Sequence, residues 1–338
     1  MDQHQARRHP HAVALALLVL ALSSAGVLWT AGCGGSDDTS QAGSLNVMTT
    51  ATFLADIAQN VAGDRFTVQS LVPRDADLHA FQPTPRDVAS VSEADLFILN
   101  GGGLEETLED TLRTAASDTT FVEASEGITP REPQPGEPLH EHAGEEEGHA
   151  AAEEGLEDEH GHEADPHFWL DPTLVVAYVE NIRDAFIAAD PEGEAEYTAN
   201  AQAYVAKLED LDAWIEAQVA TLPEEDRLLV MNHVSHGYFA DRYGFHIAGA
   251  VIPSVATGES PTAKQLAELT ETIRTEGVRA IFVELEENPQ LADQIAAETG
   301  IVVVDDLRDH SLSEPDGEAA TYIDMMKYDT RRIVEALR

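Results

Sequence analysis

The sequence is poor in basic residues and contains a single cysteine. Its 338 residues include 19 Lys and Arg, only three of them Lys, against 63 Asp and Glu, which gives a formal net charge of −44. This balance excludes the basic surface by which proteins bind nucleic acid or anionic membranes. The lone cysteine excludes an internal disulfide framework and any metal site built from several cysteines. A hydrophobic content of 43% still provides for a sizeable core, and the length suggests about two domains.

Long apolar runs are also scarce, and the clearest one spans residues 12–22. Two arginines precede it and small residues lead from it to Cys33, which is the order of a secretory signal. The run is short for a stable span of about 20 residues. The segment resembles a bacterial lipoprotein signal, which implies a signal peptide over 1–33, lipidation of Cys33 and a flexible tether over 34–43. An ordinary signal peptide or an uncleaved anchor is the alternative, and each places the rest of the chain outside the cytoplasm.

Strand and helix patterns alternate in two parts of the chain, which predicts an α/β fold with two lobes. Each lobe is expected to hold a mostly parallel sheet flanked by helices. Strands are expected at 45–50, 66–72, 96–100, 227–232, 245–251, 280–284 and 301–304. Helices are expected at 53–62, 87–94, 174–188, 262–276, 290–299 and 322–337.

A longer helical pattern covers residues 194–221 and separates these two parts. At 1.5 Å per residue it predicts a helix of roughly 40 Å, long enough to join two lobes. We therefore divide the mature chain into an N-terminal lobe over 44–193, a linking helix over 194–222 and a C-terminal lobe over 223–338.

Four residues with metal-binding side chains lie where such sheets gather their ligands, beyond the carboxyl ends of strands. They are His79, His167, His233 and Asp305. Two come from each half of the chain, so a metal held by all four would sit between the lobes. Three imidazoles and one carboxylate suit tetrahedral Zn²⁺, whereas Mn²⁺ favours more oxygen ligands.

Each of these residues also has an ordinary structural interpretation. A single histidine after a strand is often a surface or capping residue, and Asp305 can cap a turn, with Asp306 beside it as a rival ligand. His236 lies three residues after the third histidine and can share its metal. His246 and His310 stand alone in the sequence, and we interpret them as structural or surface residues.

A series of short motifs, in order along the chain, resembles one known family. The motifs cover residues 77–79, 82–85, 165–172, 233–239, 258–262 and 320–328, and the most specific is Asp-Pro-His-Phe-Trp-Leu-Asp-Pro at 165–172. The chain is similar here to the metal-binding receptors of bacterial ABC importers, the zinc/manganese solute-binding family. The resemblance extends from about residue 45 to the C-terminus.

This resemblance implies metal capture rather than catalysis, so we expect no enzyme. The family's ligands fall on His79, His167, His233 and Asp305. Histidine at the third position resembles the zinc branch, whereas a carboxylate there resembles the manganese branch. An aromatic residue usually stands where this chain has His236. The implied partner is a membrane permease with its ATPase, and the receptor is expected to be a monomer tethered by a lipid anchor.

An acidic insert over 132–165 is a second sign of cation handling. It contains 13 acids and no Lys or Arg, together with five histidines, His140, His142, His149, His160 and His162. Such tracts are compositional metal-binding candidates, and zinc receptors of the family have a similar loop at this point. We expect an accessory role in gathering zinc at low affinity. The alternative is a solvated acidic linker.

Three other functions stay open at this point. The same receptor fold can serve Mn²⁺ or Fe²⁺. A zinc hydrolase would need an open coordination position for water and a nearby general base. Four protein ligands would leave no coordination position open. Some relatives of the family are described as adhesins, but the sequence has no exposed adhesive repeat.

Overall fold

The computed structural model describes residues 45–133, 137, 164–258 and 260–338. The signal peptide, Cys33, the tether and the five histidines of the insert lie outside these residues. Among the residues that the model describes, no helix is both long enough and apolar enough to cross a membrane.

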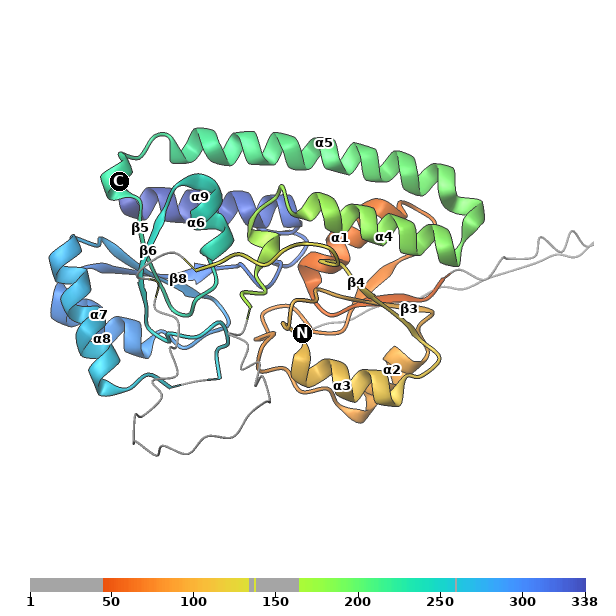
Figure 1. The fold of residues 1–338 in the computed structure, drawn as a ribbon, viewed down its shortest axis with the longest axis horizontal. Coiled ribbons are helices and arrows are strands. Elements are labelled where there is room, and N and C mark those ends of the chain that lie inside the picture. Colours follow the sequence, from red (N-terminus) through yellow and green to blue (C-terminus); the bar gives the residue numbers. More distant parts are fainter. Residues whose placement is uncertain (1–44, 134–136, 138–163, 259) are drawn as a thin grey trace, which may run out of the picture. The chain divides into compact units, whose positions relative to one another are not determined.

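The first lobe is built on a four-stranded parallel sheet with the order β2-β1-β3-β4. Its strands are β1 (Val47–Thr49), β2 (Val68–Ser70), β3 (Leu96–Leu99) and β4 (Thr120–Glu123). Its helices are α1 (Thr52–Ala62), α2 (Pro85–Ser92), α3 (Glu106–Ala115) and α4 (Val175–Ala189). Alternate strand residues face opposite sides. Leu96 and Ile98 of β3 share a core with α1 and α4, while Phe97 and Leu99 pack with α2 and α3. Figure 1 shows α1 and α4 on one side of this sheet and α2 and α3 on the other.

The second lobe repeats this plan, with the parallel order β6-β5-β7-β8. Its strands are β5 (Leu228–Met231), β6 (His246–Ala250), β7 (Ala280–Glu284) and β8 (Val302–Leu307). Its helices are α6 (Gly237–Tyr243), α7 (Ala263–Glu276), α8 (Gln290–Thr299) and α9 (Tyr322–Leu337). The central strands β5 and β7 carry apolar residues on both faces because helices cover both, as in other α/β sheets. The fold class expected from the sequence is confirmed.

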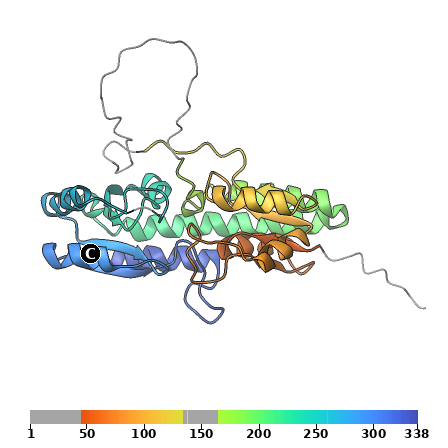
Figure 2. The same ribbon diagram turned by 90° about the horizontal axis from the view of Figure 1, so that it is seen from below.

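The 26-residue helix α5 (Glu194–Val219) joins the two lobes. Its buried stripe consists of Tyr197, Ala201, Tyr204, Leu208, Leu211, Ile215 and Val219. The stripe packs against α1 and α4 of the first lobe and against α6 and α9 of the second. Figures 1 and 2 both show α5 lying alongside α4 and α9. One apolar core therefore continues from lobe to lobe.

Three elements were not expected from the sequence, namely α3, β4 and α6. A fourth difference concerns β8, which was expected to end at Val304 and continues to Leu307. The register of its pairing with β7 shifts between Phe282 and Glu284. Asp305 and Asp306 lie within the strand. The carboxyl end of β8 is therefore Leu307 rather than Val304, which matters for the site described below.

Candidate functional site

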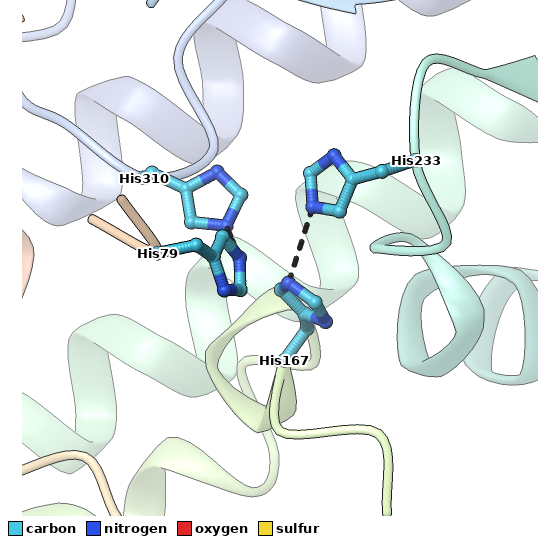
Figure 3. Close-up of side chains that lie close together, drawn as sticks. All are labelled: His79, His167, His233 and His310. Atoms are coloured by element: carbon cyan, nitrogen blue, oxygen red, sulfur yellow. Dashed lines mark hydrogen bonds between the residues drawn. The ribbon is translucent and has the colours of Figure 1, made fainter. Parts of the chain in front are cut away.

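Four histidines from four separate segments meet at one point. His79 lies in the loop between β2 and α2, and His167 precedes a 3₁₀ turn (Phe168–Leu170). His233 follows β5, and His310 follows β8. Loops at the carboxyl ends of the strands thus carry the group, as expected for sheets of this type. We call these four residues the histidine cluster; Figure 3 shows their rings turned toward one another.

The ring nitrogens are spaced as metal ligands would be. The Nε2 atoms of His79 and His310 are 3.2 Å apart, and those of His167 and His233 are 3.4 Å apart. One nitrogen from each ring lies within 4.8 Å of the other three. Two ligands about 2.05 Å from a tetrahedral Zn²⁺ are about 3.3 Å apart. The cluster therefore has room for one ion of this size at its centre.

Buried carboxylates stand behind three of the rings. Asp165 Oδ1 is 2.8 Å from His167 Nδ1, and Asp309 Oδ1 is 2.8 Å from His310 Nδ1. An ionised carboxylate can only accept a hydrogen bond, so Nδ1 carries the hydrogen and a neutral ring presents its Nε2 lone pair to the centre. Behind His233, the Oε1 atoms of Glu287 and Glu284 lie 3.1 and 3.3 Å from Nδ1. Converging lone pairs repel one another unless a cation or a proton lies between them.

The electrostatic environment differs between the two pairs of rings. Burial and the neighbouring imidazoles lower the pKa of His79 and of His167 well below the ordinary value of 6.5. Burial acts in the same direction on His233 and His310, but Glu284 and Glu287 outweigh it at the first and Asp309 at the second. The pKa values of these two rings are raised. The pocket therefore combines neutral nitrogen donors with carboxylates that favour a positive charge.

A second group of polar side chains borders the histidine cluster. It consists of His236, Glu284 and Asp309, all buried. His236 Nδ1 is 3.6 Å from Asp309 Oδ2, and burial lowers the pKa of His236 to about 4. Burial raises the pKa of Glu284 to about 7. Glu284 Oε2 and Asp309 Oδ2 have no hydrogen-bond partner among the described residues, so both oxygens are available to a cation.

The structure corrects one predicted site residue. Asp305 lies within β8 and is exposed, away from the three predicted histidines. Its rival Asp306 accepts hydrogen bonds from Tyr328 and Arg332 of α9. The loop that reaches the cluster begins three residues later than expected, because the strand extends to Leu307. His310 fills the fourth position.

Two further expectations concerned isolated histidines. His310 is not a surface residue, since it is 6% exposed and lies inside the cluster. His246 lies at the start of β6 and is partly buried, apart from the cluster. Sequence reasoning also missed Glu284, Glu287 and Asp309. The one available signal was that Glu284 ends a buried strand.

Aromatic residues hold the loops of the cluster in place. Trp169 stacks on Phe53 of α1, with ring centroids 4.5 Å apart. Its indole Nε1–H donates to the carbonyl oxygen of Asp309, and Tyr322 of α9 donates to the carbonyl of Trp169. These bonds connect the loop of His167 in the first lobe with the second lobe. They give Trp169, the middle residue of the Phe-Trp-Leu sequence, a role in joining the lobes.

The lobes also contact each other through the loop that follows β2. Arg74 Nη1 donates to the carbonyl of Ser313 at 2.6 Å, and Asp75 accepts from Arg308 Nη1 at 2.9 Å. The backbone N–H of Asp75 donates to Ser311 Oγ at 2.9 Å. His79 and His310 belong to these two loops, so the same contacts set the distance between their rings.

Two parallel-sheet α/β lobes, a connecting helix and a polar centre between them define a class of protein, the two-lobed metal-binding receptors. Residues 47–336 match the family described as "ZnuA: Zinc-uptake complex component A periplasmic", and the chain belongs to that family. The expectation of a binding protein rather than an enzyme is confirmed by this membership.

Relatives of known cargo differ in the metal that they bind. The chain is 34% identical to the manganese-binding lipoprotein MntA of Halalkalibacterium halodurans, over 92% of this chain and 95% of the relative. It is 31% identical to the iron-binding protein YfeA of Yersinia pestis, over 91% and 90%. The periplasmic zinc-binding protein TroA of Treponema pallidum has a similar structure. Its TM-score is 0.75 at 25% identity, with 87% of this chain and 99% of that chain covered.

Proposed function

We propose that this protein captures Zn²⁺ outside the cytoplasm and delivers it to the permease of an ABC importer, whose ATPase partner drives uptake. The observation that supports this most directly is the convergence of four imidazole nitrogens, three of them on rings backed by buried carboxylates. The family and the names of the relatives support a role in metal transport. The ion is the cargo of the receptor.

The proposed ligands are the four members of the histidine cluster. His79, His167 and His233 keep the role that the sequence predicted, and His310 takes the place assigned to Asp305. Imidazole nitrogen is a softer donor than carboxylate oxygen, which favours Zn²⁺ over Mn²⁺. The Nε2 separations agree with a tetrahedral zinc site. Asp309 orients His310 through its Nδ1.

A second candidate cargo is Mn²⁺ or Fe²⁺, and one observation favours it. The buried carboxylates of Glu284 and Asp309 border the cluster and have oxygens without a hydrogen-bond partner in the described part of the chain. Carboxylate oxygens are the ligands that Mn²⁺ prefers. Asp309 lies in the loop after β8, directly beside the proposed ligand His310.

The metal bound in the cell separates these cargoes. Affinity alone is a poor guide, because nitrogen and oxygen sites generally bind Zn²⁺ more tightly than Mn²⁺. The metal content of protein recovered from the envelope of cells grown with equal Zn²⁺ and Mn²⁺ is therefore the test. We expect zinc, at one ion or more per chain. If the recovered protein held mainly manganese or iron, that metal and not zinc would be the cargo. If it bound no divalent metal, the proposal of a metal receptor would be wrong.

The remaining parts of the proposal concern residues outside the described ranges. We propose that Cys33 carries a lipid that tethers a monomeric receptor to the membrane; its signal-like sequence and the lipoprotein relatives support this. We also propose that the insert gathers zinc at low affinity beside the cluster. Removing residues 138–163 should leave the highest zinc affinity unchanged. If the shortened protein lost high-affinity zinc binding, the insert would be a primary site.

A further inference from the structure

One buried arginine joins the two ends of the insert. Arg131 is 5% exposed, and its guanidinium binds Glu137 at both oxygens, at 2.7 and 2.9 Å. Its Nη1 also lies 3.7 Å from Asp165 Oδ2. Glu137 stands near the start of the insert and Asp165 is its last residue. Arg131 therefore bridges Glu137 and Asp165, which lie near the two ends of the insert in the sequence.

Asp165, at the end of the insert, contacts a member of the histidine cluster. Asp165 Oδ1 accepts hydrogen bonds from the backbone N–H of His167 at 3.0 Å and from its Nδ1 at 2.8 Å. Asp165 Oδ2 faces Arg131 and has no hydrogen-bond partner among the described residues. The two oxygens have separate tasks, since one orients His167 and the other faces the positive charge of Arg131.

The same arginine reaches α6, in the second lobe. Its Nε donates to Asp241 Oδ2 at 2.7 Å. Its backbone N–H donates to the hydroxyl of Tyr238, which in turn donates to the carbonyl of Asp165 at 3.0 Å. A β-carbon at Gly237 would lie 2.4 Å from Arg131 Nη1 and 2.6 Å from Asp165 Oδ2, so glycine permits this close approach.

We propose that Arg131 is a positioning residue. It binds Glu137, near the start of the insert, and faces Asp165, at its end, and it holds Asp165 so that His167 presents its Nε2 to the metal. The inference rests on the proposed metal-binding function of the cluster. It adds that the ion pair between Arg131 and Glu137, outside the cluster, sets the affinity of the cluster. The geometry of the guanidinium fork is essential, because it contacts three carboxylates on three segments at once.

The expected size of the effect follows from the role of such supporting groups. Loss of a carboxylate that orients a histidine ligand typically costs about 10- to 100-fold in metal affinity. Arg131→Met should approach this range, because Asp165 loses the charge that faces it. Arg131→Lys should restore the affinity only in part, since a lysine cannot bind two carboxylate oxygens in parallel. Glu137→Gln should weaken binding by about threefold or more, because a charge-assisted pair becomes an ordinary hydrogen bond.

The test is zinc titration calorimetry on these variants of the full chain. Arg183→Met is the matched control, because Arg183 pairs with its neighbour Asp184 on the surface of α4. It should bind zinc like the unaltered protein. In the double variant, Glu137→Gln should add little to Arg131→Met, since both changes break one ion pair.

A second readout separates positioning from a general loss of stability. Nitrogen NMR reports which ring nitrogen of His167 carries the proton, and Arg131→Met should weaken or abolish the Nδ1–H signal in folded, zinc-free protein. Unchanged affinity together with an unchanged His167 signal would overturn the inference. If Arg131→Met does not fold, unaltered affinity in Glu137→Gln would overturn it equally. Failure of the proposed function is a distinct result, in which the unaltered protein itself does not bind zinc through His167.

Discussion

Trp169 and Asp309 are joined across the two lobes by a hydrogen bond of 2.6 Å, from the indole Nε1–H to the backbone carbonyl oxygen. Trp169 lies two residues after His167, and Asp309 immediately precedes His310. The bond therefore ties together two loops that each carry a member of the histidine cluster. Since the indole also stacks on Phe53, the position of both loops depends on the core of the first lobe.

Replacing this indole should affect stability and binding together. Trp169→Phe keeps an aromatic ring against Phe53 but leaves the buried carbonyl of Asp309 without its donor. An unsatisfied buried group costs about 1–3 kcal/mol, which chemical denaturation would measure. We expect zinc affinity to fall by about fivefold or more, because the bond orders the loop of His310. Trp214→Phe is the control: Trp214 lies on α5 near Lys327 and Arg331, and its replacement should leave zinc affinity intact.

The fourth position of the cluster gives a sharp contrast between two variants. His310→Ala should weaken zinc binding by about 100-fold or more, because it removes one of four proposed ligands and its supporting contact with Asp309. Asp305→Ala should bind zinc normally, since Asp305 is exposed on β8. Calorimetry at one pH compares the two, and circular dichroism checks that both are folded. If zinc affinity fell in Asp305→Ala but not in His310→Ala, Asp305 would be the fourth ligand, as expected from the sequence.

The sequence was sufficient to predict the architecture of both lobes. Strand β3 is apolar throughout and β7 is apolar up to its last residue, Glu284, because helices cover both faces of each strand. Helices such as α9 keep a 3.6-residue period. Short elements were missed. The helix α6 has only seven residues, which is too short for its periodicity to be recognised.

The cluster was predicted in part, and the failures have local causes. Asp305 and Asp306 looked like the end of a strand, because charged residues seldom continue one. The strand does continue, since β8 is the last strand in its sheet and its outward positions are exposed. His310 stands in a polar loop and resembled a surface residue. It is buried by tertiary contacts with His79, Trp169 and His233, and the sequence does not reveal such contacts.

Zinc binding should release protons at pH values below the pKa values of His233 and His310. The raised pKa values of His233 and His310 mean that protons compete with the metal at these rings. Affinity should therefore rise as pH rises toward their pKa values and fall as pH is lowered. Calorimetry in buffers of different ionisation enthalpy counts the protons released. Asp309→Asn should release fewer, because His310 loses the carboxylate that raises its pKa.

Without metal, three buried carboxyl groups should make the protein less stable as pH rises from about 4.5 to about 7, with little further loss by about 8. Burial raises the pKa of Asp165, Glu284 and Glu105, each to about 7. A carboxyl group with a raised pKa contributes stability below its unfolded pKa and loses it as pH rises through the folded value. Each proton lost contributes a slope of up to about 1.4 kcal/mol per pH unit. His79 and His167 act in the opposite direction, but only below their ordinary pKa of 6.5.

Zinc should remove part of this pH dependence, because its charge favours the ionised forms of Asp165 and Glu284 beside the cluster. Chemical denaturation across this pH range, with and without zinc, measures the difference. Glu105 offers a control, since its partners are Thr50 and the backbone of Asn100 and Gly101, at the end of β3. Glu105→Gln should flatten the zinc-free profile and leave the zinc-dependent part unchanged. A zinc-free stability that stays level or rises over this range would show that these buried carboxyl groups do not titrate as described.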